Sequence, residues 1–318
     1  MMEVMQSKKR VPLSSVAALL FLIALVVAVM FATFHPAAMP LRQTAAAPGA
    51  MDPFANINTD AKAVIVIDMQ SGRTLYQKNA DVQLPLASLT KVALVLATTE
   101  VLLLDSIITI PYYAGGAEGS EHLTKGERWR VRDVIDFTLI ASSNNGAEIL
   151  ADAANDALHK RYPNSPADSA TLSRMNDIAR TLGLQHTYFL NVSGLDLSTT
   201  LAGAYGSARD VATLYAYAAS AEPSLFAATA RDSILLTAVN EDATRNAYNT
   251  NDAQGAIPGL IMGKTGTTDL AGGNLAVVFD VGLAHPVVAV VLGSSEEGRF
   301  ADMKKLVATT RKALTETE

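Results

Sequence analysis

A serine and a lysine stand three positions apart in residues 84–96, where a proline-led turn runs into an apolar stretch. We expect a helix with Ser88 at its start and Lys91 one turn further on. Residues three apart lie on one helix face with Cβ atoms about 5–6 Å apart, so the lysine amine reaches the serine hydroxyl. A serine becomes a strong nucleophile beside a base, and a lysine becomes a base when burial or positive charge lowers its pKa. The pair indicates nucleophilic catalysis, although most serines at helix starts are only caps.

Two further segments carry side chains that could serve such a serine. The segment Ser142-Ser143-Asn144 offers a hydroxyl that could relay a proton to a leaving amine and an amide that could hold a peptide group. The segment Lys264-Thr265-Gly266-Thr267 offers an ammonium, two hydroxyls and a glycine, beside which another chain can lie close to the backbone. Each segment alone is commonplace, since such serines and asparagines usually cap helices. Their occurrence together and in this order favours a serine-based active site.

Composition excludes several other classes of function. The chain has 318 residues, 49% of them hydrophobic, with a net charge of −6. No global basic field therefore exists for nucleic acid. The chain contains no cysteine, and its five histidines show no His-x-x-x-His spacing. Disulfides and thiolate metal sites are thus excluded, and a zinc hydrolase is disfavoured. We expect neither a metal nor a cofactor.

The N-terminal region has the features of a membrane anchor. Residues 1–10 include Lys8, Lys9 and Arg10, and residues 11–34 form an apolar run without a charge. The run matches the roughly 20 residues that span a hydrocarbon core and exceeds the roughly 7–15 apolar residues of a signal peptide. We therefore predict a cytoplasmic N-terminus (1–10), a transmembrane anchor (11–34), a linker (35–57) and an extracytoplasmic catalytic domain (58–318). A cleaved signal and a secreted protein are the alternative, because small residues follow the run.

The rest of the chain alternates between short β-rich and longer helical patterns. We predict strands at 63–68, 74–79, 107–110, 261–268, 274–281 and 286–292, and helices at 88–104, 131–140, 147–158, 170–182, 211–221 and 299–314. Because strands stand at both ends and helices between them, we predict an α+β fold with one antiparallel sheet built from both ends of the domain and helices on its faces. Trp129 is expected in the core, and residues 231–251 show only one apolar run.

The three motifs, in this order, resemble the penicillin-recognising serine enzymes. Closer matches are similar to the D-alanyl-D-alanine carboxypeptidases, the low-molecular-mass penicillin-binding proteins. They are Ala87-Ser88-Leu89-Thr90-Lys91, residues 191–196, residues 207–210, and residues 264–268 with Ala271-Gly272. The resemblance covers roughly residues 60–314. It implies a β-lactamase/transpeptidase-like fold and a peptidoglycan stem peptide as substrate, with β-lactams as covalent inhibitors.

The resemblance also implies a role for each candidate residue. Ser88 would attack the carbonyl between two D-alanines while Lys91 takes its proton. Ser142 would pass a proton to the departing D-alanine, and Asn144 would hold the substrate chain. The groups implied for the terminal carboxylate are Lys264 with Thr265 or Thr267, beside Gly266. The backbone N–H groups of Ser88 and Thr267 would form the oxyanion hole.

Two features depart from the family pattern. Members often carry a second, β-rich domain and a C-terminal amphipathic anchor, whereas little sequence follows the last helix here. We expect the N-terminal span to take the place of that anchor. In addition, Asn145-Gly146 follows Asn144. This local variation affects the expected shape of the substrate groove.

Three alternatives remain open at this point. A class A β-lactamase shares the motifs but needs a glutamate to activate the deacylating water, and no glutamate occurs between Glu148 and Glu222. A D,D-endopeptidase or transpeptidase differs only in the bond cut or the acceptor of the acyl group. A non-catalytic module that binds cell-wall peptide is the third, and the presence of both Ser88 and Lys91 argues against it.

Overall fold

The computed structural model describes residues 52–111, 123–239 and 243–315, all within one compact unit, residues 41–318. The predicted N-terminal segments 1–10 and 11–34 and most of the linker lie outside the described residues. Among the described residues, no helix has the length and apolar character needed to cross a membrane. The anchor therefore stays a prediction.

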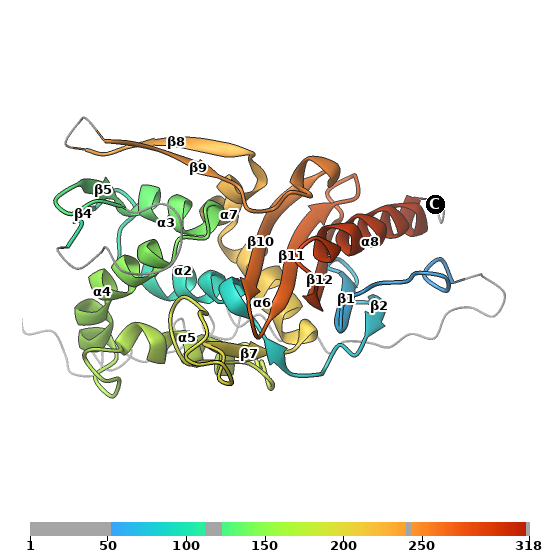
Figure 1. Ribbon diagram of the computed structural model, residues 1–318, viewed down its shortest axis with the longest axis horizontal. Helices are drawn as coiled ribbons and strands as arrows, with labels where there is room; N and C mark the ends of the chain where they lie inside the picture. The colour runs from blue at the N-terminus through green and yellow to red at the C-terminus, as the bar shows by residue number, and fades with distance from the viewer. Residues whose placement is uncertain (1–51, 112–122, 240–242, 316–318) are drawn as a thin grey trace, which may run out of the picture. The chain divides into compact units, whose positions relative to one another are not determined.

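The central element is a five-stranded antiparallel sheet with the strand order β10-β11-β12-β1-β2 (Figure 1). Its strands are β1 (Ala63–Asp68), β2 (Thr74–Lys78), β10 (Leu260–Thr268), β11 (Gly272–Asp280) and β12 (Pro286–Ser294). The first strand of the domain pairs with the last one, which confirms the predicted sheet from both ends of the domain. All six residues of β1 are buried, as expected for a continuous apolar run that is covered on both faces.

Helices cover both faces of this sheet (Figure 1). Alternate residues of a strand point to opposite faces, and Val64 and Val66 belong to the cluster that includes Phe300 and Leu306 of α8 (Gly298–Thr315). Ile65 instead belongs to the larger cluster, which includes residues of α6 (Ala208–Ala221). The two faces of the sheet therefore contribute side chains to two separate hydrophobic clusters, one on each side.

A group of helices lies beside the sheet and carries the first two motifs. They are α2 (Lys91–Thr99), α3 (Val131–Ile140), α4 (Asn144–Arg161), α5 (Ala170–Thr181) and the short α7 (Pro223–Phe226). Helix α2 is buried from Lys91 to Thr98, as the apolar pattern predicts. The predicted end of this helix near residue 104 is wrong, because the chain turns after Thr99 and leaves Leu103 78% exposed.

Two other helices begin earlier than their apolar patterns predict. Helix α4 starts at Asn144 rather than at residue 147, because the Ser143 side chain caps it by accepting a hydrogen bond from the Gly146 N–H at 3.0 Å. Helix α6 starts at residue 208 rather than 211, with Ser207 accepting from the Asp210 N–H at 3.1 Å. A capping serine sets a helix start independently of where the apolar period begins.

Three small sheets complete the described part of the chain. They are β3 (Leu84–Pro85), β7 (Ala204–Gly206) and β6 (Tyr188–Phe189) in one sheet, β4 (Ile107–Thr109) with β5 (Arg128–Arg130), and β8 (Ser233–Thr237) with β9 (Thr244–Tyr248). The β8–β9 hairpin occupies the region for which the sequence pattern predicts only an apolar run. Three 3-10 turns, η1 (Ala87–Thr90), η2 (Ala227–Ala230) and η3 (Gln254–Ala256), link the larger elements. Trp129 on β5 is fully buried, as predicted.

Candidate active site

Ser88 and Lys91 form the hydrogen-bonded pair that their spacing predicts. Ser88 lies in η1, and Lys91 is the first residue of α2. The Lys91 Nζ donates to Ser88 Oγ at 2.6 Å, to Asn144 Oδ1 at 2.7 Å and to the Ser193 carbonyl at 3.0 Å. These three acceptors hold the amine in one position against the serine hydroxyl.

Burial makes the Lys91 amine a much better base than an ordinary lysine. The side chain is fully buried, and this loss of solvation lowers the pKa of Lys91 to about 7, while the carboxylate of Glu148 acts in the opposite direction. Burial disfavours the charged form of an amine. A large fraction of Lys91 is therefore neutral at physiological pH and able to accept a proton.

The backbone around Ser88 is held in an uncommon conformation. Ala87 has a φ of +50°, a left-handed value that few non-glycine residues adopt. Strand β10 lies directly against this turn, since a Cβ on Gly266 would stand 2.8 Å from the Leu86 carbonyl oxygen and 3.1 Å from the Ser88 nitrogen. The predicted close approach at Gly266 is thus confirmed, and the approaching chain is the protein's own nucleophile turn.

The second serine pairs with the second buried lysine. Lys264 Nζ on β10 donates to Ser142 Oγ at 2.7 Å and to the Thr265 carbonyl at 2.9 Å. Ser142 stands between α3 and α4 with a φ of +58°. Burial, followed by the positive charges of Lys91 and Arg299, holds the pKa of Lys264 well below its ordinary value. The side chains named from the three motifs therefore meet at one place.

The two threonines of the third motif each have a partner that the sequence analysis did not anticipate. Thr265 Oγ1 shares a 2.5 Å hydrogen bond with Thr250 Oγ1. Arg299, at the start of α8, donates to Thr267 Oγ1 and to the Gly266 carbonyl, the latter at 3.1 Å. Arg299 is only 8% exposed, and its Nε has no hydrogen-bond partner among the described residues. A cation is thus fixed beside β10.

One of these two missed residues leaves a signal in the sequence. Arg299 lies one turn before Met303 and two turns before Leu306, on the buried and mainly apolar face of α8. A charged residue on a buried stripe needs a specific partner and marks a position worth examining. Thr250 carries no such signal, because it follows a hairpin that the sequence pattern does not reveal.

The segment 191–196 closes the side of the site. The Ser193 carbonyl accepts from Lys91, and Asp196 accepts from Thr268 Oγ1 at 2.9 Å on the last residue of β10. Gly194 has a φ of +84° and lies so close to the Ala87 carbonyl that a Cβ would stand 2.0 Å from it. The segment 207–210 lies elsewhere, where Asp210 accepts from the Thr187 hydroxyl at 2.9 Å.

No three histidine, aspartate or glutamate side chains of the described residues lie close enough together to hold a metal ion. The groups gathered at Ser88 are hydroxyls, amines, an amide and a guanidinium. Such groups can transfer protons, form a covalent bond to an acyl carbon and bind an anion.

Comparisons with known proteins show which family the chain is similar to. A family model described as D-alanyl-D-alanine carboxypeptidase matches residues 47–296. The chain is 28% identical over 255 residues to D-alanyl-D-alanine carboxypeptidase DacF of Bacillus subtilis, covering 78% of this chain and 61% of that protein. It is 30% identical over 243 residues to D-alanyl-D-alanine carboxypeptidase DacB2 of Mycobacterium tuberculosis, covering 75% of this chain and 77% of that protein.

The structure is also similar to a solved penicillin-binding protein. Penicillin-binding protein D2 of Listeria monocytogenes, in its ampicillin-bound form, aligns with a TM-score of 0.66 and 27% identity, covering 80% of this chain and 98% of that one. The α+β, transpeptidase-like fold predicted from sequence is thereby confirmed. The chain spans about three-fifths of the length of some relatives, including the Bacillus protein at 61%.

Proposed function

The chain belongs to the D-alanyl-D-alanine carboxypeptidase family, and from this premise we propose that it removes the terminal D-alanine of peptidoglycan stem peptides through an acyl-enzyme on Ser88. The observation that carries the proposal is the 2.6 Å hydrogen bond between Ser88 Oγ and the fully buried Lys91 amine, whose pKa is lowered to about 7. A nucleophile and a base in hydrogen-bond contact are the minimal requirement for this chemistry.

In the first step, neutral Lys91 accepts the Ser88 proton as Oγ attacks the carbonyl carbon of the penultimate D-alanine. The backbone N–H groups of Ser88 and Thr267 would stabilise the oxyanion, and the close approach of β10 to the Ser88 turn at Gly266 supports this role. The C–N bond then breaks, and the terminal D-alanine leaves as an amine after taking a proton from Ser142, which Lys264 holds at 2.7 Å. Ser142 regains a proton from Lys91, so Lys91 is neutral again before the second step.

In the second step, water attacks the ester carbonyl and Lys91 again accepts a proton. Lys91 returns this proton to Ser88 Oγ as the ester C–O bond breaks, and the shortened peptide leaves as a carboxylate. Asn144 accepts a hydrogen bond from Lys91 at 2.7 Å, and it would position both the amine and the substrate chain. Neither step requires a metal or a cofactor.

The substrate carboxylate has a matching group of donors. Thr267 and Arg299 are hydrogen-bonded to each other at the same strand that carries Lys264 and Thr265. A guanidinium pairs with a carboxylate in a planar, two-bond geometry, which suits a free C-terminus. We propose that Arg299 and Thr267 bind the terminal carboxylate, with Lys264 and Thr265 beside it.

A β-lactam carries a strained amide and a carboxylate and would enter the same site. The solved relative from Listeria is an ampicillin-bound form. We propose that β-lactams acylate Ser88 and are released slowly.

We also propose that the protein acts outside the cytoplasmic membrane, held there by residues 11–34. The support comes from the sequence, namely a basic cluster ahead of a long apolar run. Extraction of membranes with alkaline carbonate, followed by protease treatment of intact spheroplasts, tests this. Release by carbonate would refute an integral anchor, and protection from the protease would refute the outward orientation.

The proposed activity is tested by intact-mass spectrometry on the full chain in detergent. It is incubated with penicillin and, separately, with diacetyl-lysyl-D-alanyl-D-alanine. We expect one slowly reversed penicillin adduct, release of D-alanine from the peptide, and loss of both in Ser88→Ala. An adduct that persists in Ser88→Ala would mean that another residue is the nucleophile.

The same experiment separates the alternatives. Rapid loss of the penicillin adduct without release of D-alanine would indicate a β-lactamase. Transfer of the acyl group to an added amine in preference to water would indicate a transpeptidase, and cleavage only of cross-linked dimers would indicate an endopeptidase. Absence of any adduct or product would favour a binding module.

A further inference from the structure

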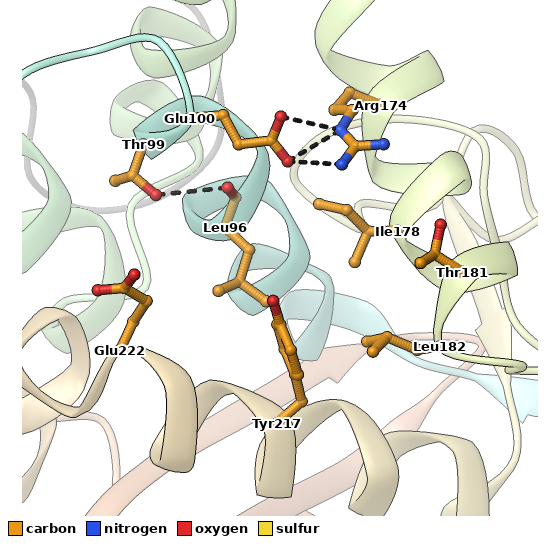
Figure 2. Close-up of a pocket in the computed structure, with 9 residues that line it drawn as sticks. All are labelled: Leu96, Thr99, Glu100, Arg174, Ile178, Thr181, Leu182, Tyr217 and Glu222. Atoms are coloured by element: carbon orange, nitrogen blue, oxygen red, sulfur yellow. Dashed lines mark hydrogen bonds and ion pairs between the residues drawn. The ribbon is translucent and has the colours of Figure 1, made fainter. Parts of the chain in front are cut away.

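A cavity lies between α2, α5 and α6, at the opposite end of α2 from Lys91 (Figure 2). Its volume is about 180 Å³. Glu100, which lines it, follows Lys91 by nine residues, so the cavity lies roughly 13 Å along the helix from the catalytic amine at 1.5 Å per residue. The cavity is therefore separate from the site described above.

The inner wall of this cavity is apolar. Leu96 and Ile178 line it and are each only 7% exposed, and Leu182 lies beside them. Figure 2 shows the Tyr217 ring rising from α6 toward Leu96, and this ring is 39% exposed. A cavity of roughly 150 Å³ with such walls accepts a benzene ring. The space here thus fits one ring or a short branched alkyl group.

One edge of the cavity is a fixed, neutral ion pair. Arg174 donates to both carboxylate oxygens of Glu100, at 2.7 to 3.0 Å, and Tyr162 donates to the same carboxylate at 2.7 Å. The Arg174 guanidinium also stacks over the Tyr162 ring at 4.7 Å. Because Glu100 and Arg174 neutralise each other, this edge contributes no net charge.

The remaining charge in the lining is a carboxylate. Glu222 lines the cavity at the C-terminal end of α6 and is exposed. Within the described residues, neither its carboxylate nor the Tyr217 hydroxyl has a hydrogen-bond or ion-pair partner. The lining therefore combines an apolar space, an aromatic ring and one unpaired negative charge. A cation beside an aromatic ring and a carboxylate is favoured by both groups.

We propose that this cavity is a binding site for a small organic amine, in which a single ring or short alkyl body fills the space against Leu96 and Ile178 and the ammonium lies toward the side of the cavity that Glu222 lines. The site is independent of the reaction at Ser88, so its test needs no turnover. An anion of the same shape is disfavoured because the only unpaired charge in the lining is negative.

The test is a ligand-observed NMR titration of the full chain in detergent with 2-phenylethylamine. Its uncharged and anionic counterparts, 2-phenylethanol and phenylacetate, are titrated in parallel. We expect saturable binding of the amine, weaker binding of the alcohol and no binding of the acid. The amine should bind equally well to protein that has been treated with penicillin, which distinguishes this site from the one at Ser88.

Variants connect the binding to the named residues. Glu222→Gln should lower the affinity for the amine by about fivefold or more and leave the affinity for the alcohol unchanged. Tyr217→Leu should lower the affinity for the amine because the aromatic ring is lost. Asp156→Asn, an exposed carboxylate on α4, is the matched control and should change nothing. Equal affinity of amine and acid, or an unchanged amine affinity in Glu222→Gln, would overturn the proposal, as would the absence of saturable binding.

Discussion

The two lysines of the site are buried to a degree that few lysines reach. Lys91 is fully buried and Lys264 is 2% exposed, and burial is the largest cause of the lowered pKa at each. Two ammonium groups held this close would repel each other. The arrangement therefore favours a state in which at least one of the two amines is neutral, which is the state that proton transfer from Ser88 requires.

This electrostatic arrangement predicts the pH dependence of acylation. The neutral form of Lys91 is the active one, so the rate of acylation by penicillin should rise with pH through about 7 and then level off. The Glu148 carboxylate raises the pKa of Lys91. Glu148→Gln should therefore move the midpoint of the profile to lower pH.

Stopped-flow or quenched-flow acylation rates between pH 5 and 9 provide the measurement. Asp156→Asn removes an exposed carboxylate from the same helix and should leave the midpoint unchanged. A midpoint that moves to higher pH in Glu148→Gln, or a rate independent of pH, would contradict the assignment of Lys91 as the base.

Arg299 should determine the preference for a free carboxylate. Hydrogen bonds to charged groups contribute about 1.5–3 kcal/mol, so Arg299→Gln should lower kcat/KM for the D-alanyl-D-alanine peptide by roughly 10- to 100-fold. For the same peptide ending in a carboxamide, Arg299→Gln should lower kcat/KM far less. Steady-state release of the C-terminal residue measures both substrates.

A second arginine of the same helix serves as the control for that experiment. Arg311 donates to the Asp280 carbonyl at 3.0 Å, away from the site. Arg311→Gln should therefore leave the ratio of the kcat/KM values for the two substrates unchanged. If Arg299→Gln slows both substrates equally, the guanidinium only supports β10 and does not contact the carboxylate.

At this scale the sequence identifies the residues of the site but not all of their partners. Ser88 and Lys91 are neighbours through one helical turn, which spacing alone predicts. The contact of Lys91 with Asn144, 53 positions later, depends on how α2 and α4 pack. The resemblance to a family implies only that Asn144 holds the substrate chain, so its contact with Lys91, like the contacts of Arg299, comes from the folded chain.

Among the elements, the segment between β9 and β10 holds two parts of the site in register. The Thr250 N–H donates to the Ile140 carbonyl at the end of α3 at 3.2 Å, and its hydroxyl bonds to Thr265 on β10. The corner that carries Ser142 is thus connected to the strand that carries Lys264 by a second route. This connection predicts a role for a residue outside the three motifs.

Thr250→Val keeps the shape and the backbone bond but removes the hydroxyl. We expect acylation by penicillin to slow several-fold while the melting temperature changes little, because one partly exposed hydrogen bond contributes about 1 kcal/mol. The control is Thr229→Val, whose hydroxyl accepts from the Gly263 N–H on the same strand at 3.1 Å. It should lower stability without a comparable effect on the rate, and the reverse pattern would contradict the prediction.

Element boundaries show where sequence patterns are informative. Helix α3 matches its prediction at both ends, because its apolar period stops at the serine corner. The β8–β9 hairpin escapes prediction because its residues alternate only weakly between buried and exposed positions. Short strands of that kind are specified by their neighbours more than by their own pattern.

In the molecule as a whole, one buried carboxylate joins the beginning and the end of the described domain. Asp302 on α8 is fully buried and accepts from the Asp60 and Ala61 N–H groups at 3.1 and 3.0 Å and from Ser294 Oγ at 3.1 Å. The residues just ahead of β1 are thereby fixed to the last helix and to the end of β12.

Asp302→Asn should lower the free energy of unfolding by about 2–3 kcal/mol, since an amide presents donors to groups that are themselves donors. Urea unfolding followed by circular dichroism measures the change, with the exposed Asp156→Asn as the control. The acylation rate of the folded variant should stay near that of the parent. An unchanged midpoint would show that the buried carboxylate is dispensable.

The pairing of β1 with β12 has a further consequence for biosynthesis. A nascent chain exposes β1 and the Ser88 segment early, and β1 can pair with β2 at once, but its second partner, β12, is made more than 200 residues later. Until then an apolar strand has an open edge that can pair with another chain. The open edge of β1 is thus exposed to pairing with other chains until β12 is made. A truncated chain that lacks β10 to α8 would carry the nucleophile and base without the strand that completes the site.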